Sequence, residues 1–380
     1  RERIGYKWEP KLIDETVYEI SLHDQSGELL ITQASSGEIE LVSFVLGVLG
    51  YGLRGGVLLI DEPELHLHPR WQGLMRNALV ELAEQNQTQI IAATHSPNFI
   101  TPETLPYVHR VARDRFGATH VYSLGEEHGE NRRDLLHIIR SYNNERMFFA
   151  DRVILVEGIS DRLLFDALVR YLTPESNSPE VVEVLDVGGK HNFDKYRSFL
   201  DRMKVPTAII ADLDYAYDLN KDELVDLFET NYRKVYKNVL ENKRSRDRES
   251  LAEELDRAIQ TCDCEKLRGL WEYIKSRHRV LREGLTDGQR KRLEEFIEEQ
   301  KQNNIFILRR GKIEDYLPKE NRSLDGIIDL TKEENFTAWV EDPSNEGARE
   351  LLEIVREILR LDPQPPGIQQ PTGGSKLAKA

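Results

Sequence analysis

Residues 55–69 read GGVLLIDEPELHLHP, a glycine turn and four apolar residues followed by two adjacent carboxylates. The apolar run predicts a buried strand over residues 57–60, which ends on Asp61 and Glu62. Carboxylates held at the end of a buried strand cost free energy unless a metal ion, a proton or a substrate compensates them. The stretch therefore predicts a functional site rather than a purely structural element.

The segments on both sides of this strand alternate between helix and strand patterns. A Ser/Gly turn at 35–37 opens a long apolar helix, a second helix is predicted near 71–85, and residues 89–93 predict a second strand. Alternation of this kind is typical of an α/β fold with helices packed on a sheet. We therefore expect a three-layer α/β architecture for the N-terminal part of the chain.

The carboxylate pair and its neighbouring turns have the residue types of a nucleotide-hydrolysing site. Asp61 would hold Mg²⁺ through water, and Glu62 would act catalytically by polarising the attacking water. A Ser/Gly turn that opens a helix presents N–H groups to an anion, although the same turn also fits a simple helix cap. An imidazole after the next strand could meet a phosphate or merely close a turn. The candidate nucleotide-binding residues are Ser35, Ser36, Gly37, Glu38, Asp61, Glu62 and His95.

Three stretches, SSGE, VLLIDEPELHLHP and ATHSP, resemble in order and spacing the ATPase heads of the ABC class, in the AAA-type branch shared with DNA-repair ATPases. The resemblance implies that the first stretch reaches across a dimer to nucleotide bound by the partner. No G-x-x-x-x-G-K-[S/T] phosphate cradle occurs in the sequence. Because the chain also begins at Arg1, we expect the N-terminal half of the ATPase to lie outside it, and we expect no ATP hydrolysis by the chain alone.

A second group of acidic residues follows apolar runs farther along the chain, in VILVEGISD, AIIADLDYAYD and ILRRGKIEDYLP. Carboxylates that converge at strand ends repel one another unless a divalent cation compensates them, and hard oxygen ligands favour Mg²⁺ or Mn²⁺. Two such ions can activate a water and stabilise the leaving oxygen of a phosphodiester. The candidate metal ligands are Glu157, Asp161, Asp212, Asp214 and Glu314.

Lys312 precedes Glu314 in the last of these stretches and could neutralise charge that develops on a scissile phosphate. A surface ion pair with Glu314 or Asp315 is the simpler alternative, and each acidic stretch taken alone is common in solvated turns. The succession of all three on strand ends of one α/β segment favours a catalytic site. Its candidate catalytic residues are Glu157, Asp212, Asp214 and Lys312.

This succession of acids resembles the Toprim domain of topoisomerases, primases and certain nucleases. The resemblance implies metal-binding or acid/base roles for Glu157, Asp161, Asp212 and Asp214, and GKIEDYL is similar to the closing element of the nuclease-type domain. DVGGKHNF is similar to the middle turn of that domain, which implies structural roles for Gly188 and Gly189 and a phosphate contact for Lys190. An ABC-type ATPase followed by a Toprim domain resembles the OLD (overcoming lysogenization defect) endonucleases. Members of that family are metal-dependent, cut or nick DNA, and in several cases act against phage.

Composition limits the cellular context. The 380 residues are 39% hydrophobic, but no apolar run approaches the roughly 20 residues of a membrane span, so we expect a cytoplasmic protein without membrane contact. A net charge of −15 argues against a protein that coats nucleic acid over its whole surface, while a local basic patch would still permit DNA binding. Residues 237–248 form such a candidate patch, although a solvated helix face with internal ion pairs explains them equally well. Cys262 and Cys264 are expected to be reduced surface thiols.

These patterns predict an α/β chain of four segments. They are a partial ATPase head at 1–145, a Toprim domain with a mostly parallel sheet at 147–335 containing a helical insertion at about 216–304, a helical segment at 336–362 and a disordered tail at 363–380. We expect a metal-dependent DNA endonuclease regulated by its ATPase domain, in phage defence or DNA repair, that uses Mg²⁺ or Mn²⁺, binds ATP and DNA, and forms a homo-oligomer. The alternative is an ATP-dependent DNA-binding clamp or sensor whose Toprim domain does not cut.

Overall fold

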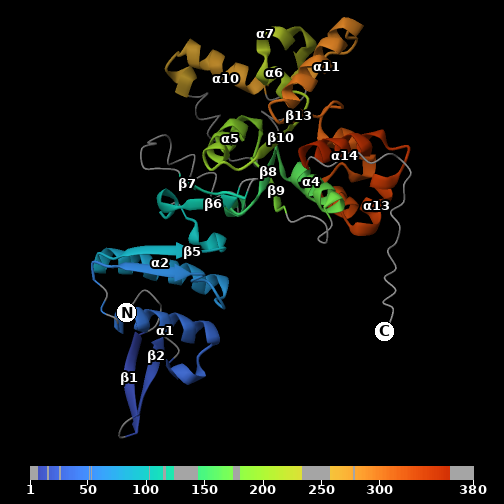
Figure 1. The fold of residues 1–380 in the computed structure, drawn as a ribbon. Coiled ribbons are helices and arrows are strands. Elements are labelled where there is room, and N and C mark those ends of the chain that lie inside the picture. Colours follow the sequence, from blue (N-terminus) through green and yellow to red (C-terminus); the bar gives the residue numbers. More distant parts are fainter. Residues whose placement is uncertain are drawn as a thin grey trace, which may run out of the picture. The chain divides into compact units, whose positions relative to one another are not determined.

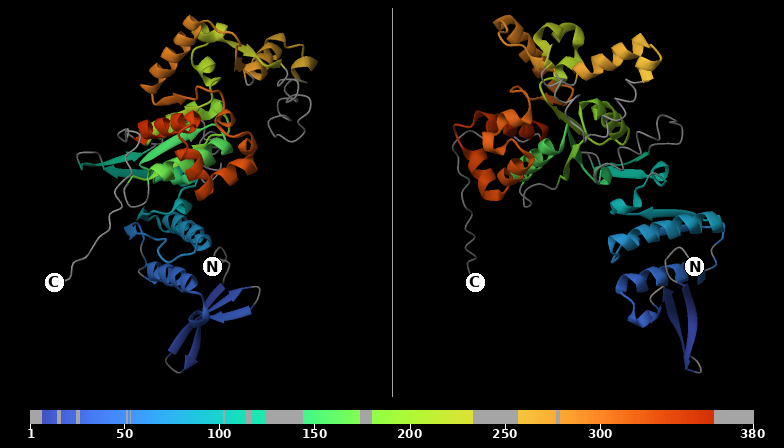
Figure 2. Two further views of the ribbon diagram at one scale, coloured as in Figure 1. Left: turned by 90° about the vertical axis from the view of Figure 1, so that its right-hand side faces the viewer. Right: turned by 180° about the vertical axis from the view of Figure 1, so that it is seen from behind.

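The computed structural model describes residues 7–14, 17–24, 27–50, 52, 54–101, 103–113, 117–123, 144–173, 180–232, 257–276 and 279–359. The chain divides into two compact units, the first formed by Arg1–Phe149 with Arg202–Lys204 and the second by Ala150–Asp201 with Val205–Ala380. Each unit has its own strands and helices (Figure 1, Figure 2). Within the described ranges, no helix is both long enough and apolar enough to cross a membrane.

The first unit opens with an antiparallel sheet that none of the patterns above predicted. Its strands are β1 (Lys7–Asp14), β2 (Val17–Asp24) and β3 (Gly27–Leu30), in that order. The elements that carry the predicted nucleotide-binding residues follow as α1 (Ser36–Gly50), β4 (Val57–Asp61), α2 (Pro69–Asn86) and β5 (Gln89–Ala93). The unit continues through the short helices η2 (Pro97–Phe99) and η3 (Leu105–Tyr107), the antiparallel strands β6 (His109–Arg113) and β7 (Thr119–Ser123), and η4 (Asn144–Phe148).

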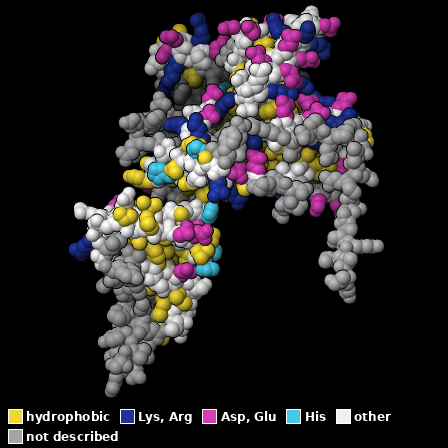
Figure 3. All heavy atoms as spheres, viewed as in Figure 1, with side chains coloured by type: hydrophobic (Ala, Val, Ile, Leu, Met, Phe, Trp, Pro, Cys, Tyr) yellow, Lys and Arg dark blue, Asp and Glu magenta, His cyan; other side chains and the backbone are white. Residues whose placement is uncertain are grey.

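Strands β4 and β5 pair in parallel, with Asp61 opposite Ala93. The side chains of Ile60 and Ile90 pack against a core that α1 and α2 share, whose buried members are Leu41, Leu67, Met75, Leu79 and Phe99. The sequence patterns predicted a buried strand at 57–60, but Leu59 is 72% exposed and Val57 and Ile91 are more than half exposed, so β4 is buried on one face only. The described part of this unit covers only one face of the pair, and hydrophobic side chains are visible on its surface in Figure 3.

The second unit is built around a four-stranded sheet in which all neighbouring strands are parallel, as predicted. The strand order is β13-β10-β8-β9. The strands are β8 (Arg152–Val156), β9 (Val182–Asp186), β10 (Thr207–Ala211) and β13 (Ile305–Ile307). Their Val-, Ile- and Leu-rich sequences fit a sheet that is buried on both faces, and Leu155 and Val156 are both 0% exposed.

Helices from both ends of this unit bury the sheet. α4 (Ile159–Leu172) packs on β9 and contacts α12 (Leu324–Leu330) and α14 (Glu346–Leu359), with α13 (Glu333–Glu341) between the last two in sequence. The resulting core joins Ile154 of β8 and Phe165 of α4 to Val355 of α14. The segments η5 (Lys190–Asn192) and α5 (Phe193–Arg202) follow β9 in the chain. The C-terminal helices are therefore part of the same folded unit as the sheet.

The predicted insertion between β10 and β13 is mainly helical but also contains a strand pair that the sequence patterns missed. Its described elements are α6 (Tyr215–Leu219), α7 (Lys221–Leu224), η6 (Val225–Leu227), β11 (Phe228–Thr230), α10 (Cys264–Ser276), β12 (Arg279–Leu281) and α11 (Asp287–Lys301). β11 and β12 pair antiparallel across a long stretch of sequence. Both cysteines are free and exposed. The basic stretch at 237–248 and the tail predicted at 363–380 lie outside the described residues.

Candidate active site

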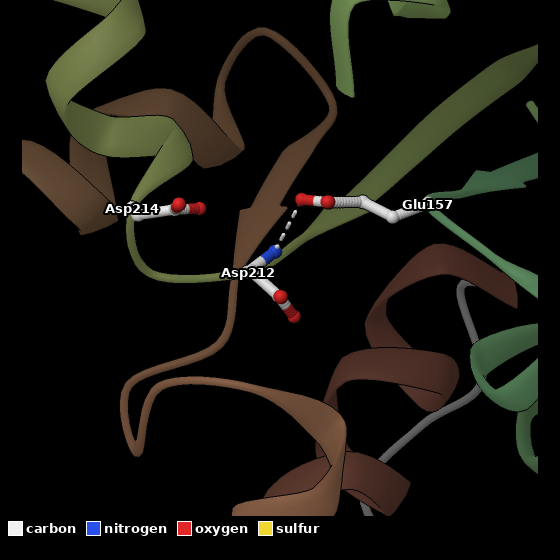
Figure 4. A group of neighbouring side chains, drawn as sticks. All are labelled: Glu157, Asp212 and Asp214. Carbon is white, nitrogen blue, oxygen red and sulfur yellow. Dashed lines mark hydrogen bonds between the residues drawn. The ribbon is translucent and has the colours of Figure 1, made fainter. Parts of the chain in front are cut away.

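Two parallel strand ends bring three acidic side chains of the second unit together. Glu157 follows β8 and Asp212 follows β10, its neighbour in the sheet. The backbone N–H of Asp212 donates a 3.1 Å hydrogen bond to Oε1 of Glu157, and Asp214 precedes the first turn of α6. Each of the three residues offers one carboxylate oxygen, and these oxygens lie within 4.8 Å of one another (Figure 4). The sequence patterns predicted a single site for all three residues, and the fold brings them together.

The three side chains enter this cluster from different directions. Figure 4 shows the carboxylates of Glu157 and Asp214 pointing toward one another, while that of Asp212 points away from the backbone hydrogen bond. β10 ends at Ala211, so Asp212 and Asp214 lie in a turn rather than on one face of a continuing strand. The turn is what allows their oxygens to approach the same point as that of Glu157.

A glycine turn after β9 supports the position of Glu157. The backbone N–H of Gly189 donates a 2.8 Å hydrogen bond to the carbonyl of Glu157. Gly188 and Gly189 have φ values of +70° and +116°, in the region that side chains rarely adopt. The close approach of this turn to the end of β8 thus depends on two glycines in succession, consistent with the structural role expected for them.

Lys190 follows this turn and lies inside the acidic cluster. Only 7% of the residue is exposed, and its Nζ lies 3.0 Å from Oδ2 of Asp214 and 2.8 Å from Oδ2 of Asp218. Burial opposes protonation of this amine, but the two aspartates outweigh it and raise the pKa of Lys190 above its usual value. The resemblance implied a phosphate contact for this residue, whereas the structure places its ammonium in buried ion pairs.

Mutual repulsion and burial favour the protonated forms of the acids around this cluster. Burial and the charges of Asp212 and Asp214 raise the pKa of Glu157, and burial raises that of Asp212 against the opposing effect of Lys312. Burial and the charge of Asp212 raise the pKa of Asp161 to about 7, although its carboxylate accepts a 3.0 Å hydrogen bond from the N–H of Gly158. Acidic side chains that resist ionisation in this way are typical of a cation-binding site, because a bound cation would offset their negative charges.

Lys312 reaches the cluster from the loop after β13. Its Nζ lies 3.4 Å from Oδ2 of Asp212, and about half of its side chain is exposed. Burial opposes protonation, but Asp212 and Asp214 raise the pKa of Lys312 above its usual value. The simpler alternative, a surface pair with Glu314 or Asp315, does not describe this geometry, because the side chain pairs with the central acid of the cluster.

The predicted ligands Asp161 and Glu314 lie around the central three acids. The charge of Glu314 raises the pKa of both Asp161 and Asp212, so Glu314 lies near enough to interact with each of them. Among the described residues, the acids whose oxygens converge within 4.8 Å are Glu157, Asp212 and Asp214. Carboxylate oxygens are the donors that Mg²⁺ and Mn²⁺ prefer, so the donor set fits a divalent cation.

The predicted nucleotide-binding residues of the first unit lie at two places. Asp61 ends β4 and is exposed, while Glu62 is half-buried and its N–H donates a 2.9 Å hydrogen bond to the carbonyl of Ala93 at the end of β5. Glu62 has a φ of +48°, a strained conformation for a residue with a side chain, of the kind that concentrates at functional sites. His95 follows the same end of β5, and its N–H donates a 2.7 Å hydrogen bond to Oε1 of Glu64.

The Ser/Gly turn lies at the start of α1. Ser35 precedes the helix and accepts a 3.0 Å backbone hydrogen bond from Ile39, Ser36 is the first helical residue, and Glu38 lies in the first turn. A Cβ atom at the buried Gly37 would lie 3.5 Å from Cδ1 of Trp71 in α2, an ordinary van der Waals distance, so this residue packs directly against α2. The structure therefore pairs Asp61 and Glu62 with the strand end that carries His95, and places the Ser/Gly turn against α2.

Two groups of residues that shape the acidic site were not identified from the sequence patterns. Asp218, the second partner of Lys190, lies one helical turn after Asp214 in DYAYD, and this spacing could have indicated that both face the same side of α6. Tyr316 and Glu350 hold the loop that carries Lys312, through a 2.7 Å hydrogen bond. No local pattern could have identified this second pair, because 34 residues separate its members.

Comparisons with known proteins agree with this division of sites. Residues 148–214 match the model of the Toprim domain of overcoming lysogenization defect-like proteins, a range that contains the three clustered acids and Lys190. Residues 10–101 match a model described as an AAA domain, putative AbiEii toxin, of a type IV toxin–antitoxin system, a range that contains Asp61 and His95.

The chain is also similar to three curated relatives. It is 29% identical over 218 residues to an OLD nuclease of Thermus scotoductus, covering 56% of this chain and 38% of that protein. It is 24% identical over 285 residues to the Old nuclease of Escherichia phage P2, covering 73% and 46%. It is 25% identical over 188 residues to an endonuclease GajA of Bacillus cereus, covering 43% and 26%. The chain spans less than half the length of each of these relatives.

Proposed function

We propose, from the premise that this chain belongs to the OLD family and joins an ATPase-like segment to a Toprim domain, that it cuts DNA as a metal-dependent endonuclease. The observation that carries the proposal is the convergence of three carboxylate oxygens within 4.8 Å at neighbouring strand ends. Two lysines, Lys190 and Lys312, pair with acids of this cluster. They do not fully offset its negative charge, since the pKa values of Glu157 and Asp212 remain raised. The names of the relatives supply the reaction class, a nuclease.

Glu157, Asp212 and Asp214 would hold one Mg²⁺ or Mn²⁺, and Asp161 and Glu314 would help to hold a second. Such ions supply Lewis-acid stabilisation of the phosphodiester and a more acidic water. The half-exposed ammonium of Lys312 can approach a phosphate from solvent while it remains 3.4 Å from Asp212. It would stabilise the negative charge that develops on the scissile phosphate. Glu157, held by the N–H of Asp212, would orient the attacking water or accept its proton.

The ATPase-like segment would regulate this cleavage rather than perform it. Asp61 and Glu62 would act on Mg²⁺ and water, and His95 on the γ-phosphate, once a phosphate cradle and the Ser/Gly turn of a second head complete the site. The described β4–β5 pair leaves Leu59 exposed on its uncovered face, where a further layer of a complete ATPase domain would pack. We infer a homo-oligomer in which ATP controls access of DNA to the Toprim site, in phage defence or DNA repair, in the cytoplasm.

The test is cleavage of supercoiled plasmid in Mg²⁺ or Mn²⁺, with and without ATP, by the wild-type chain and by Glu157→Gln and Asp212→Asn. The amide introduced by Glu157→Gln keeps an oxygen that can accept the N–H of Asp212, so this variant removes charge with little change of structure. The matched control is Asp329→Asn. Asp329 lies in α12 and forms an exposed ion pair with Lys332. We expect nicked or linear product from the wild type and the control, and a loss of at least about 100-fold in both site variants.

Two other outcomes would contradict the proposal. Equal cleavage by the wild type and both site variants would place the activity outside this cluster or in a contaminant. Binding of plasmid without cleavage in either metal would instead favour an ATP-dependent clamp or sensor. Electrophoretic mobility shifts recorded in EDTA with the same proteins distinguish loss of DNA binding from loss of chemistry.

A further inference from the structure

The buried ion pairs of Lys190 place a positively charged side chain inside the carboxylate cluster. Lys190 is 7% exposed, and its side chain bridges Oδ2 of Asp214 and Oδ2 of Asp218 at 3.0 and 2.8 Å. Asp214 is one of the three acids whose oxygens converge, and Asp218 is not. Lys190 thus connects the convergent acids to a further acid one helical turn away.

The position of this ammonium is fixed from both sides. The Gly188–Gly189 turn sets the backbone of Lys190 against the end of β8, through the hydrogen bond from Gly189 to Glu157. On the other side, Asp214 directly precedes α6 and Asp218 lies within it, and Tyr215 between them is buried against Phe193 with ring centroids 5.2 Å apart. A lysine held in this way loses little further rotamer entropy and cannot readily turn outward to a DNA phosphate.

We propose that Lys190 is a positioning residue of the metal centre, whose ammonium orients Asp214 and lowers the affinity of the cluster for divalent cations. Asp218 acts in the opposite sense, because it shares the ammonium with Asp214 and partly cancels its charge. This inference rests on the proposed metal site. It differs from a phosphate-binding role, in which Lys190 would contact substrate directly.

Electrostatics predicts effects of opposite sign for the two partners. Lys190→Met removes a positive charge beside the acids and should tighten Mn²⁺ binding by about tenfold, because a cation bound by Asp214 would no longer be repelled by the neighbouring ammonium. Asp218→Asn leaves Lys190 charged with one anionic partner fewer and should weaken Mn²⁺ binding by a similar factor. The double variant restores the net charge and should bind close to wild type. A merely structural role for this cluster would weaken binding in all three variants.

The test measures free Mn²⁺ by electron paramagnetic resonance during titration of the metal-free full chain, at constant pH and ionic strength. Lys190→Arg keeps the charge and should stay within about threefold of wild type, which also controls for folding. Lys332→Met and Asp329→Asn, an exposed Lys–Asp pair in the same unit, should leave Mn²⁺ binding unchanged. Circular dichroism of each metal-free variant checks that it is folded.

The outcomes separate this inference from the proposed function. If the wild type binds no Mn²⁺, the metal centre itself is wrong, and the inference fails with it. If the wild type binds Mn²⁺ but Lys190→Met and Asp218→Asn shift the affinity in the same direction or not at all, only the role of Lys190 is wrong. If Lys190→Met weakens DNA binding in EDTA and leaves Mn²⁺ affinity unchanged, Lys190 contacts phosphate instead.

Discussion

The phenolic O–H of Tyr316 donates a 2.7 Å hydrogen bond to Oε1 of Glu350, which joins the loop after β13 to the C-terminal helix α14. The same phenolic oxygen accepts a 3.1 Å hydrogen bond from the N–H of Arg310, and the side chain of Arg310 pairs with Glu350 and Glu346. Lys312 lies between these anchored residues. The C-terminal helix therefore fixes the loop that delivers this lysine to Asp212.

Tyr316→Phe should reduce cleavage and stability together. The variant leaves the N–H of Arg310 and one oxygen of Glu350 without the phenol, at a cost of about 1–2 kcal/mol in the free energy of unfolding. Because the loop would hold Lys312 less firmly, we expect about tenfold slower single-turnover cleavage of plasmid. Tyr171→Phe, which removes a hydrogen bond to Glu341 at the surface, is the control and should cleave normally. Unchanged cleavage by Tyr316→Phe would show that the loop needs no such anchor.

Lys312→Met should impair chemistry more than DNA binding. The substitution removes the ammonium 3.4 Å from Asp212 that we propose to stabilise the developing phosphate charge. We expect cleavage to slow by about 100-fold or more, with partial recovery in Lys312→Arg. Lys319→Met, an exposed lysine of the following segment, is the matched control. Rapid-quench rates at saturating protein measure the chemical step, and an equal loss in the control would mean that nonspecific charge explains the effect.

Without metal, the stability of the second unit should fall as the pH rises from about 4 toward neutrality. The pKa of Asp161 is raised from an ordinary value of 3.8 to about 7, so the folded chain retains a proton that the unfolded chain releases. The stabilisation that this retained proton gives is complete below about pH 4 and is lost by about pH 7. Each unit by which the pKa is raised contributes about 1.4 kcal/mol to the free energy of unfolding. Urea unfolding in EDTA from pH 5 to pH 8 measures this dependence.

Asp161→Asn is the variant that isolates this effect. Its amide oxygen can still accept the hydrogen bond from Gly158, but it cannot titrate. We expect a smaller fall in the free energy of unfolding between pH 5 and pH 8 than in the wild type, with the remaining fall due to Glu157 and Asp212. The same slope in both proteins would mean that Asp161 titrates normally.

The chain by itself should hydrolyse no ATP at a measurable rate. Asp61 and Glu62 occupy a strand end suited to Mg²⁺ and water, but the sequence contains no backbone cradle for the phosphates. Phosphate release in Mg²⁺ should therefore match the background, and Glu62→Gln should not alter it. Turnover that disappears in Glu62→Gln would contradict this prediction and reveal a complete site.

Leu59→Ser should reduce self-association without unfolding the first unit. The side chain is 72% exposed on the uncovered face of β4, so its removal costs little burial, within about 0.5 kcal/mol. Static light scattering against concentration should show less association than in the wild type. Leu79→Ser, in the core that α1 and α2 share, should instead lose at least about 2 kcal/mol. No change in scattering would mean that this face does not drive association.

The sequence alone determined the features that depend on local pattern. Apolar runs ending in acids predicted strands where β4, β8 and β10 occur, and the strand predicted at 57–60 agrees with β4 to within one residue, because an apolar run flanked by turns has few other stable conformations. Parallel strands place their carboxyl ends on one edge, so the convergence of Glu157 with Asp212 could be predicted from the α/β rhythm. Antiparallel pairing of β11 with β12 could not, because short strands distant in sequence carry no local signal.

Only the tertiary structure decided which partners the charged side chains take. Lys190 could equally have faced solvent and phosphate, and its burial between Asp214 and Asp218 depends on how the β9 turn meets α6. The anchoring of Lys312 depends on Tyr316 meeting Glu350, a contact that requires α14 to fold back onto the sheet. The sequence determines which side chains carry charge. The electrostatic free energy of those charges depends on their distances and burial, which only the packed structure sets.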